Sequence, residues 1–324
     1  MRNADYIYAV AYIRAKEKTL LTDSDIQTMA GMSGEKEVLG YLVEKGWGES
    51  NSAEPEMETV LAEEQEKQMK LLTTLGVDKE IIDVLFIEET YHNIKTAIKQ
   101  VCTGNVDDQA YYESEDFSAN ELRRIMRERD FDKLPEGLAK TAKDGMELML
   151  SSRDGQRLDV FVDRACLDAV EKAAATTKDK FLAEYGENKV VIADIKIAVR
   201  AADTNKSYAF CEEALAPNRT IDVKALAMAA SKGRETVLEY LEKTSMRAAA
   251  EALRESFSAF EKWCDDYIMS TLMNQKTNIE SSGPIVAFYL AKQNEIRTAR
   301  IIMTAKANGF GEEDIQKRVR RMYG

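Results

Sequence analysis

Residues 91–99 read YHNIKTAIK, and the same pattern returns as IADIKIAVR at residues 192–200 and as QNEIRTARI at residues 293–301. Each copy has a polar residue, an isoleucine, a base, a spacer and an alanine in that order. Successive copies are separated by 101 residues in both cases. Two equal offsets indicate an internal repeat of about a hundred residues, and such a repeat decides the architecture of the chain.

The apolar residues around the first copy predict a helix. They recur at steps of three and four, the spacing of one helix face, at Ile87, Tyr91, Ile94, Ile98 and Val101. Only four prolines interrupt a chain of 324 residues that is rich in strong helix formers, and strand signals are nearly absent. We therefore expect an all-α fold in which each repeat contains one long, mostly buried helix.

A shorter helical element is predicted after each long helix. The four copies are TDSDIQTMAG (22–31), FSANELRRIM (117–126), TIDVKALAMA (220–229) and GEEDIQKRVRRM (311–322). Ser, Thr and acidic residues precede the apolar positions, and their oxygens suit the free N–H groups of a helix N-terminus. The first copy follows an N-terminal helix around residues 6–18, which we interpret as a less faithful version of the long helix.

The repeat divides the chain into three similar helical bundles, at residues 1–103, 104–203 and 204–324, the last with extra C-terminal helices. Stacked in line, such units would form a solenoid with a concave groove. Three large units can also close around a pseudo-three-fold axis and enclose a funnel. The repeat pattern by itself leaves both arrangements open.

Charge and hydropathy restrict the partners. A formal net charge of −12 argues against nucleic acid and against direct adsorption to anionic lipid, because both draw affinity from Lys and Arg. The longest apolar run, YIYAVAYI at residues 6–13, is far shorter than the roughly 20 residues that span a bilayer as a helix. We expect an intracellular protein without a membrane span and with reduced thiols, since its cysteines form no CxxC pair and no secretory signal is recognisable.

Residues suited to catalysis are scarce. The single histidine, His92, stands at the start of a predicted helix, where it is more often a satisfied side chain at a helix contact than a catalytic base. No phosphate-binding G-x-x-x-x-G-K-[ST] sequence occurs. We predict no catalytic residue, no metal, no cofactor and no small-molecule substrate.

The repeat itself supplies candidate site residues, since each copy places a base two positions after its polar residue. The pairs are Asn93 with Lys95, Asp194 with Lys196, and Glu295 with Arg297. Residues two apart lie on different sides of a helix, so the members of a pair are not expected to bond to each other. We expect each pair to tie its long helix to neighbours on two sides. The alternative is that the pairs line a shared central cavity.

The C-terminus is basic in an otherwise acidic chain. It carries Arg297, Arg300, Lys306, Lys317, Arg318, Arg320 and Arg321. These residues, Arg318 and Arg321 among them, either contact an acidic partner or form a solvated face.

These stretches together resemble the C subunit of the prokaryotic V-type/A-type ATP synthases, a family related to the d subunit of the eukaryotic V-ATPase. The resemblance runs from end to end, through AYIRAKEKTLLT (11–22), YHNIK (91–95), DIKIAVRAA (194–202), SGPIVAFYLAKQNEIRTARIIMTAKANG (282–309) and DIQKRVRRMY (314–323). The long stretch at 282–309 is the most specific. Many relatives have Asn where this chain has Asp194 and Glu295, substitutions that keep a polar group and add charge.

The resemblance implies three bundles in a pseudo-three-fold, funnel-like arrangement and a non-catalytic rotor subunit. Such a protein is a socket that receives the central stalk and sits on the membrane proteolipid ring, at the cytoplasmic face of the membrane. The resemblance implies no catalytic residues, because nucleotide hydrolysis belongs to other subunits. Two other interpretations remain: a helical-repeat scaffold for unrelated proteins, and an enzyme with a dispersed site.

Overall fold

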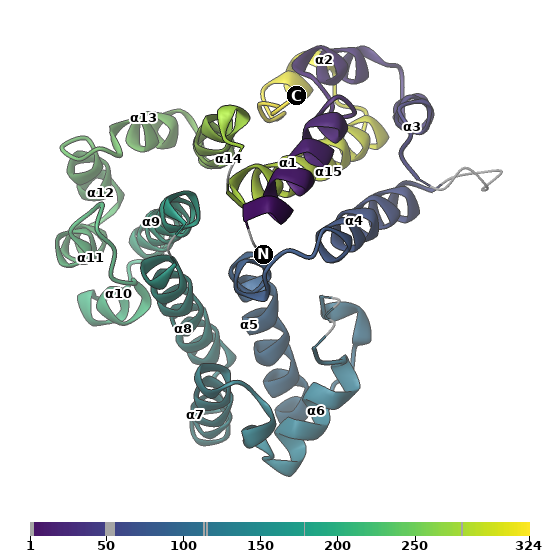
Figure 1. Ribbon diagram of the computed structural model, residues 1–324. Coiled ribbons are helices and arrows are strands. Elements are labelled where there is room, and N and C mark those ends of the chain that lie inside the picture. The colour runs from purple at the N-terminus through teal and green to yellow at the C-terminus, as the bar shows by residue number, and fades with distance from the viewer. Residues whose placement is uncertain (1–2, 49–55, 113, 115, 178, 280) are drawn as a thin grey trace. The chain divides into compact units, whose positions relative to one another are not determined.

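The computed structural model describes residues 3–48, 56–112, 114, 116–177, 179–279 and 281–324. All regular structure in these ranges is helical, without a strand, which confirms the all-α fold class. The chain divides into two compact units (Figure 1). We call Met1–Ile81 with Met246–Gly324 the terminal unit, and Ile82–Ser245 the central unit. The three bundles and their boundaries at residues 103 and 203 stay predictions.

The terminal unit joins the two ends of the chain. Its elements are α1 (Asn3–Glu17), α2 (Asp23–Gly31), α3 (Glu35–Glu44), α4 (Met57–Thr74), α13 (Arg247–Glu255), α14 (Phe257–Met273), the short 3-10 helix η3 (Asn274–Thr277), α15 (Gly283–Ala307) and α16 (Glu312–Gln316). The N-terminal helices α1, α3 and α4 pack on the C-terminal helix α15, and α16 packs on α2. Segments about 300 residues apart in sequence therefore share one core.

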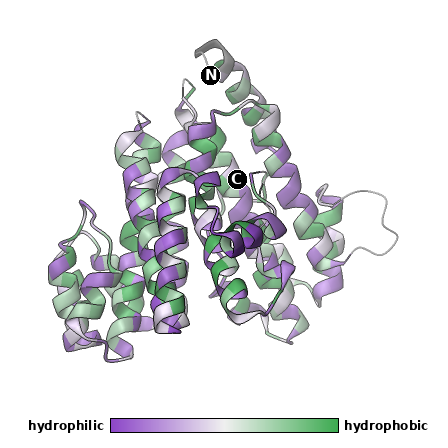
Figure 2. Cartoon of the chain, turned by 90° about the horizontal axis from the view of Figure 1, so that it is seen from below, coloured by the Kyte–Doolittle hydropathy of each residue, from purple (hydrophilic) through white to green (hydrophobic). Residues whose placement is uncertain are grey.

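That core is built on the apolar side of α15. Its Ile302 and Met303 are fully buried against Met29 of α2, Leu42 of α3 and Leu61 of α4. Each helix of the chain carries both hydrophobic and hydrophilic residues (Figure 2), as expected for helices with one face turned to a core.

The central unit contains the first two copies of the repeated stretch, at residues 91–99 and 192–200. Its elements are the greater part of α5 (Lys79–Thr103), η1 (Asp108–Ala110), α6 (Ala119–Glu128), η2 (Phe131–Lys133), α7 (Glu136–Ser152), α8 (Gly155–Thr176), α9 (Lys180–Asp203), α10 (Tyr208–Ala214), α11 (Val223–Lys232) and α12 (Arg234–Leu241). Ile94 and Ile98 of α5 pack with Met126 of α6 and Leu158 of α8. The contact of α8 with α9 is especially close, because a Cβ on Gly186 would stand 2.5 Å from the Cβ of Ala174.

The three repeated stretches lie within α5, α9 and α15, which have 25, 24 and 25 residues. The short helices expected after them are α6 and α11, and the copy near the N-terminus is α2. Their N-cap residues, Thr22, Ser118 and Asp222, each accept a hydrogen bond from a backbone N–H of the first turn. The local chemistry read from the sequence thus sets where these helices begin.

The last short helix differs from the prediction. We expected a helix over residues 311–322, but α16 ends at Gln316. The backbone N–H of Arg321 is 2.9 Å from Asp266 Oδ1 on α14, and that of Met322 is 2.9 Å from Asp23 Oδ1 on α2. The final residues leave the helix because contacts with other helices satisfy their backbone instead.

Candidate functional site

Asn93, the polar residue of the first copy, is buried on α5 with 3% of its surface exposed. Its Nδ2 donates to the carbonyl of Tyr112 at 2.9 Å, and its Oδ1 accepts from the N–H of Tyr112 at 2.9 Å. One amide therefore satisfies both backbone groups of a residue in the connection that leads to α6. The side chain holds that connection against the long helix.

Asp194, the equivalent residue of α9, is completely buried. Its Oδ1 accepts from the N–H of Ala216 at 2.9 Å, and its Oδ2 accepts from Asn218 Nδ2 at 2.9 Å. The Oδ1 of Asn218 in turn accepts from the N–H groups of Thr220 and Ile221. Burial raises the pKa of Asp194 to about 7, against the opposing effect of these hydrogen bonds. The connection held here is the one that leads to α11.

A second carboxylate of α9 holds the same connection. Glu187 Oε1 accepts from the N–H of Arg219 at 2.8 Å and from the hydroxyl of Thr220 at 2.6 Å. Two buried acids, two helical turns apart, thus fix the segment before α11.

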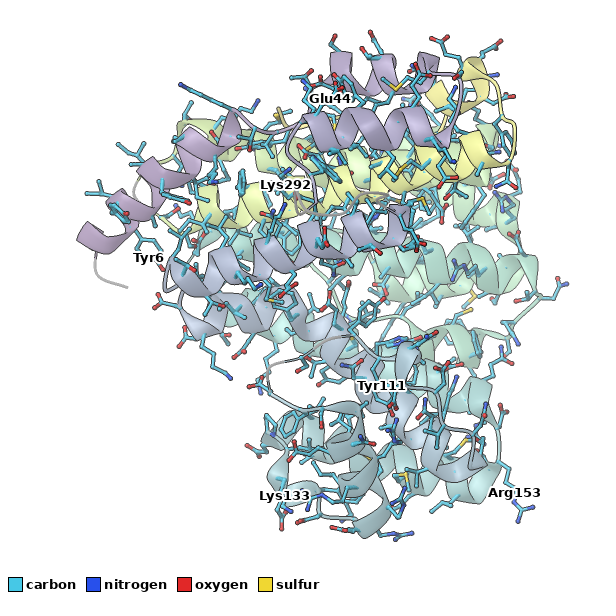
Figure 3. The ribbon with its side chains drawn as sticks, turned by 90° about the vertical axis from the view of Figure 1, so that its right-hand side faces the viewer. Tyr6, Glu44, Tyr111, Lys133, Arg153 and Lys292 are labelled. Carbon is cyan, nitrogen blue, oxygen red and sulfur yellow. The ribbon has the colours of Figure 1, made fainter. Side chains whose placement is uncertain are left out.

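Glu295, the equivalent residue of α15, is 1% exposed. Its Oε1 accepts from the N–H of Leu21 at 2.7 Å, directly before the N-cap of α2. Its Oε2 lies 3.0 Å from the ammonium of Lys292, a buried residue of α15 that is labelled in Figure 3. The same ammonium is 3.7 Å from Glu64 Oε2 on α4 and 4.8 Å from the centre of the Trp47 ring. Burial raises the pKa of Glu295 to about 7, although Lys292 opposes the shift.

The three repeated residues therefore have one local geometry. Asn93, Asp194 and Glu295 each accept a backbone N–H from the segment that leads into a short helix, α6, α11 or α2. The third copy reaches the N-terminal part of the chain. The tail that follows α15 is held by the neighbouring Asn294, whose Nδ2 donates to the carbonyl of Arg321 at 2.9 Å. Whether the three positions also line a common cavity stays a prediction.

The basic members of the pairs have other neighbours. Lys95 Nζ lies 2.7 Å from Asp163 Oδ1 on α8, and Arg297 lies 2.7 Å from Asp265 Oδ1 on α14. Lys196 is half-buried and makes no ion pair with any residue that the structure describes. Lys95 and Arg297 thus contact neighbouring helices, while the polar residues hold connections.

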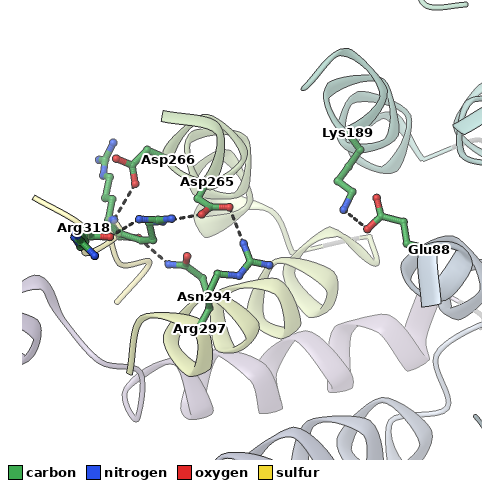
Figure 4. Close-up of polar contacts among 9 residues, drawn as sticks. Glu88, Lys189, Asp265, Asp266, Asn294, Arg297 and Arg318 are labelled. Carbon is green, nitrogen blue, oxygen red and sulfur yellow. Dashed lines mark hydrogen bonds and ion pairs between the residues drawn. The ribbon is translucent and has the colours of Figure 1, made fainter. Parts of the chain in front are cut away.

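Much of the basic C-terminal set is neutralised within the chain. Arg320, 9% exposed, donates from Nε to Asp265 Oδ2 at 2.7 Å. Asp265 therefore pairs with two arginines, Arg320 and Arg297 (Figure 4). Arg300 and Lys317 also form ion pairs, with Glu58 and Glu313. The Arg318 guanidinium lies 4.8 Å from the centre of the Phe310 ring. Arg321 is exposed, and its backbone makes the contacts described above. Whether Arg318 and Arg321 meet an acidic partner stays a prediction.

One contact between repeats was missed in the sequence. Lys189 Nζ on α9 lies 2.6 Å from Glu88 Oε2 on α5 (Figure 4), and the two residues are 101 positions apart. They hold the same place in the repeat and carry opposite charges. The offset could have revealed the pair, because equivalent residues that touch are expected where two repeats face each other.

The single histidine and the buried cysteine Cys166 are both packed against other parts of the chain. His92 Nε2 lies 3.0 Å from the carbonyl oxygen of Ala110, and its ring forms a T-shaped contact with the ring of Tyr112. Burial raises the pKa of the Cys166 thiol to about 12. The described residues contain no cluster of three His, Cys, Asp or Glu side chains that could hold a metal. In the same ranges, no helix has the length and apolar character needed to cross a membrane.

Known proteins are similar to this chain over most of its length. Residues 9–318 match the family model described as ATP synthase (C/AC39) subunit. The C subunit of the V-type sodium ATPase of Enterococcus hirae is 22% identical over 272 residues, covering 83% of each chain. The C subunit of the A-type ATP synthase of Methanocaldococcus jannaschii is 22% identical over 350 residues, covering 97% of this chain and 86% of that one. This chain belongs to the ATP synthase (C/AC39) subunit family.

Proposed function

We propose that this chain is a non-catalytic rotor subunit of a prokaryotic V/A-type rotary ATPase, in which it is a socket coupling the central stalk to the membrane proteolipid ring. The observation that carries the proposal is the family match over residues 9–318, which includes all three long helices. Two relatives, each named as the C subunit of a rotary enzyme, match over most of their own lengths. The role assigned is therefore that of the whole subunit.

The three buried polar residues of the repeat, Asn93, Asp194 and Glu295, support a mechanical role, and we call them the anchors. A part that transmits torque must resist shear between its helices, and densely packed interiors provide such stiffness. Asn93, Asp194 and Glu295 add directional bonds between each long helix and the segment entering a short helix. We assign these residues, with Lys95, Lys196 and Arg297, to holding the helices in register. Exposed Arg318 and Arg321 are the candidates for contact with a partner.

A closed arrangement of the repeats fits this role. The ion pair of Glu88 with Lys189 joins equivalent positions of α5 and α9, as expected for repeats that face each other around an axis. We propose that three bundles, at residues 1–103, 104–203 and 204–324, close in this way into a pseudo-three-fold funnel. We propose that the protein lies at the cytoplasmic face of the membrane. It is held there through the ring rather than by lipid, because an acidic chain of net charge −12 gains nothing from anionic lipid.

Co-purification tests the proposal. The tagged chain is expressed with the candidate stalk and proteolipid-ring subunits of the same cell and recovered at low salt. We expect both partners with it, and no ATP hydrolysis by the isolated chain. Recovery of neither partner would overturn the socket role, and recovery of unrelated proteins alone would favour a scaffold.

A further inference from the structure

Helix α1 is apolar on two sides. Its inner side, with Ala9, Val10 and Ile13, is 0–2% exposed and packs in the terminal unit, where α1 contacts α15. Its other side consists of Ile7, Tyr8, Ala11, Tyr12 and Ala15, all exposed, and we call these five residues the outer face of α1. Ile7 is 59% exposed, Tyr8 71% and Tyr12 39%. Four of these residues belong to the YIYAVAYI run that stood out in the sequence.

Residues 7–13 of α1 are apolar on every side of the helix, and a stretch of that kind normally lies in an interior. Large exposed hydrophobic residues elsewhere in the described ranges are separate from one another in sequence, such as Val106, Leu150 and Met228. Single residues of that kind are normal on any surface, whereas a contiguous aromatic and aliphatic patch marks a contact. The outer face of α1 is therefore an apolar patch of the kind that contacts another molecule.

The end of the helix indicates the chemistry of that cover. Lys16 and Lys18 follow the outer face and are exposed, and neither forms an ion pair with a described residue. The Lys16 ammonium lies 5.8 Å from the centre of the Tyr12 ring. The nearby Arg14 is instead committed to Glu17 and to the carbonyls of Gln275 and Asn278. The apolar outer face of α1 is thus bordered at its C-terminal end by two positive charges, those of Lys16 and Lys18.

We propose that the outer face of α1 docks onto a partner protein whose apolar contact patch is bordered by carboxylates. Tyrosine and isoleucine supply contact area with little loss of side-chain entropy, and complementary charges at the edge set the orientation. A lipid surface fits less well, because recognition of anionic membranes uses clusters of about four to eight basic residues, and this face has two. The inference rests on the proposed function, which makes the partner another component of the rotary complex.

Matched substitutions test the face. Ile7→Ser and Tyr8→Ser are compared with Val106→Ser, a change at a residue of the central unit whose exposure, 60%, matches that of Ile7. Each tagged variant is expressed with the other subunits of its rotary ATPase, and partner recovery is titrated. We expect the two α1 variants to bind at least one partner about tenfold more weakly, the scale of a well-buried interface residue, and Val106→Ser to bind as the wild type. Replacing Lys16 and Lys18 by glutamine should weaken binding mainly at low salt.

Footprinting gives a measurement that needs no variant. Hydroxyl radicals should oxidise Tyr8 and Tyr12 in the free wild-type chain and spare them in the complex. If wild type binds its partners but both variants bind equally well and the tyrosines stay reactive, the docking inference fails and the proposed function stands. If wild type binds no rotary subunit, both fail.

Two other occupants are distinguishable outcomes. Sedimentation of the wild type with vesicles of phosphatidylcholine and phosphatidylglycerol, lost in Tyr8→Ser, would mean that the face binds lipid. A dimer of the isolated chain in analytical ultracentrifugation, lost in the same variant, would mean that a second copy covers it. Either result overturns the proposal.

Discussion

Exchanging Asp194 and Asn218 tests how the connection before α11 is held to α9. In the wild type, the two Asp194 oxygens accept from the Ala216 N–H and from Asn218 Nδ2, each at 2.9 Å. Asp194→Asn keeps one acceptor oxygen and turns the other into an NH₂ group. Whichever way the new amide points, one donor faces another donor. Asn218 cannot turn to resolve the conflict, because its own oxygen already accepts from Thr220 and Ile221.

The magnitude follows from a buried donor without an acceptor, which costs about 1–3 kcal/mol. Asp194 is fully buried, so water cannot replace the lost partner. We expect Asp194→Asn to reduce the free energy of unfolding by up to this amount at pH 8, where the wild-type carboxyl is ionised and both of its oxygens accept. The double variant Asp194→Asn/Asn218→Asp restores every bond, since the amide introduced on α9 would donate to the new carboxylate and still accept from Ala216. The double variant should recover most of the loss.

Urea unfolding followed by far-UV circular dichroism measures these energies. Hydrogen exchange of the Ala216 amide reports the same bond locally. Asp132→Asn, at an exposed aspartate, is the control and should change stability by less than about 0.5 kcal/mol. The reasoning is refuted if the single variant is as stable as the wild type, or if the exchange of both residues is no better than the single change.

Three further predictions concern pH and ion pairs. Burial raises the pKa values of Asp194 and Glu295 to about 7, while unfolded carboxyls titrate near pH 4, so the folded state binds more protons than the unfolded state between these values. The free energy of unfolding should therefore fall as pH rises from 5.5 to 8. In urea titrations, Asp194→Asn/Glu295→Gln should flatten that slope relative to wild type. Arg320→Met should lower the free energy of unfolding by about 1–3 kcal/mol, because the buried guanidinium donates to Asp265. Arg297 pairs with the same carboxylate but its side chain is 59% exposed, so Arg297→Met should lower the free energy of unfolding by less than about 1 kcal/mol. Equal losses in thermal melts would contradict this prediction. Glu88→Lys should destabilise by less than about 1 kcal/mol at low salt, and adding Lys189→Glu should reverse the loss, because the side chains of Glu88 and Lys189 are 50% and 29% exposed and salt can screen the pair. An effect that persists in 1 M salt would mean that the pair does not behave as a surface ion pair.

Local structure could be predicted from the sequence because it depends on nearby residues. The spacing of Ile94 and Ile98 marks the buried side of α5, and Ser118 or Asp222 marks where a helix begins. The 101-residue offset then predicts the same buried side and the same helix start at the equivalent positions of the other copies. The same reasoning overextended α16, because helix propensity says nothing of the contacts of Arg320 and Met322 with distant helices.

The partners of the repeated residues could not be predicted. An apolar stripe shows which side of a helix is buried but not which segment covers it. Nothing near Glu295 in sequence indicates that it accepts from Leu21, 274 residues away, or that Lys292 stands between Glu295 and Glu64. The repeat singled out the polar position in the sequence, but the groups that it bonds could be found only in the tertiary structure.

The chemistry of the three anchors differs although their geometry is shared. Asn93 holds a backbone N–H and carbonyl with a neutral amide, whereas Asp194 and Glu295 perform the task with carboxylates whose pKa burial raises to about 7. A neutral amide accepts the same N–H without the cost of burying charge, so the acids must compensate elsewhere. Asp194 does so by orienting Asn218, which caps the next two N–H groups, and Glu295 does so by pairing with Lys292. Each acid therefore serves a larger network than an amide could, at a stability that depends on pH, and the repeat preserves a position in space while its chemistry follows the local neighbours.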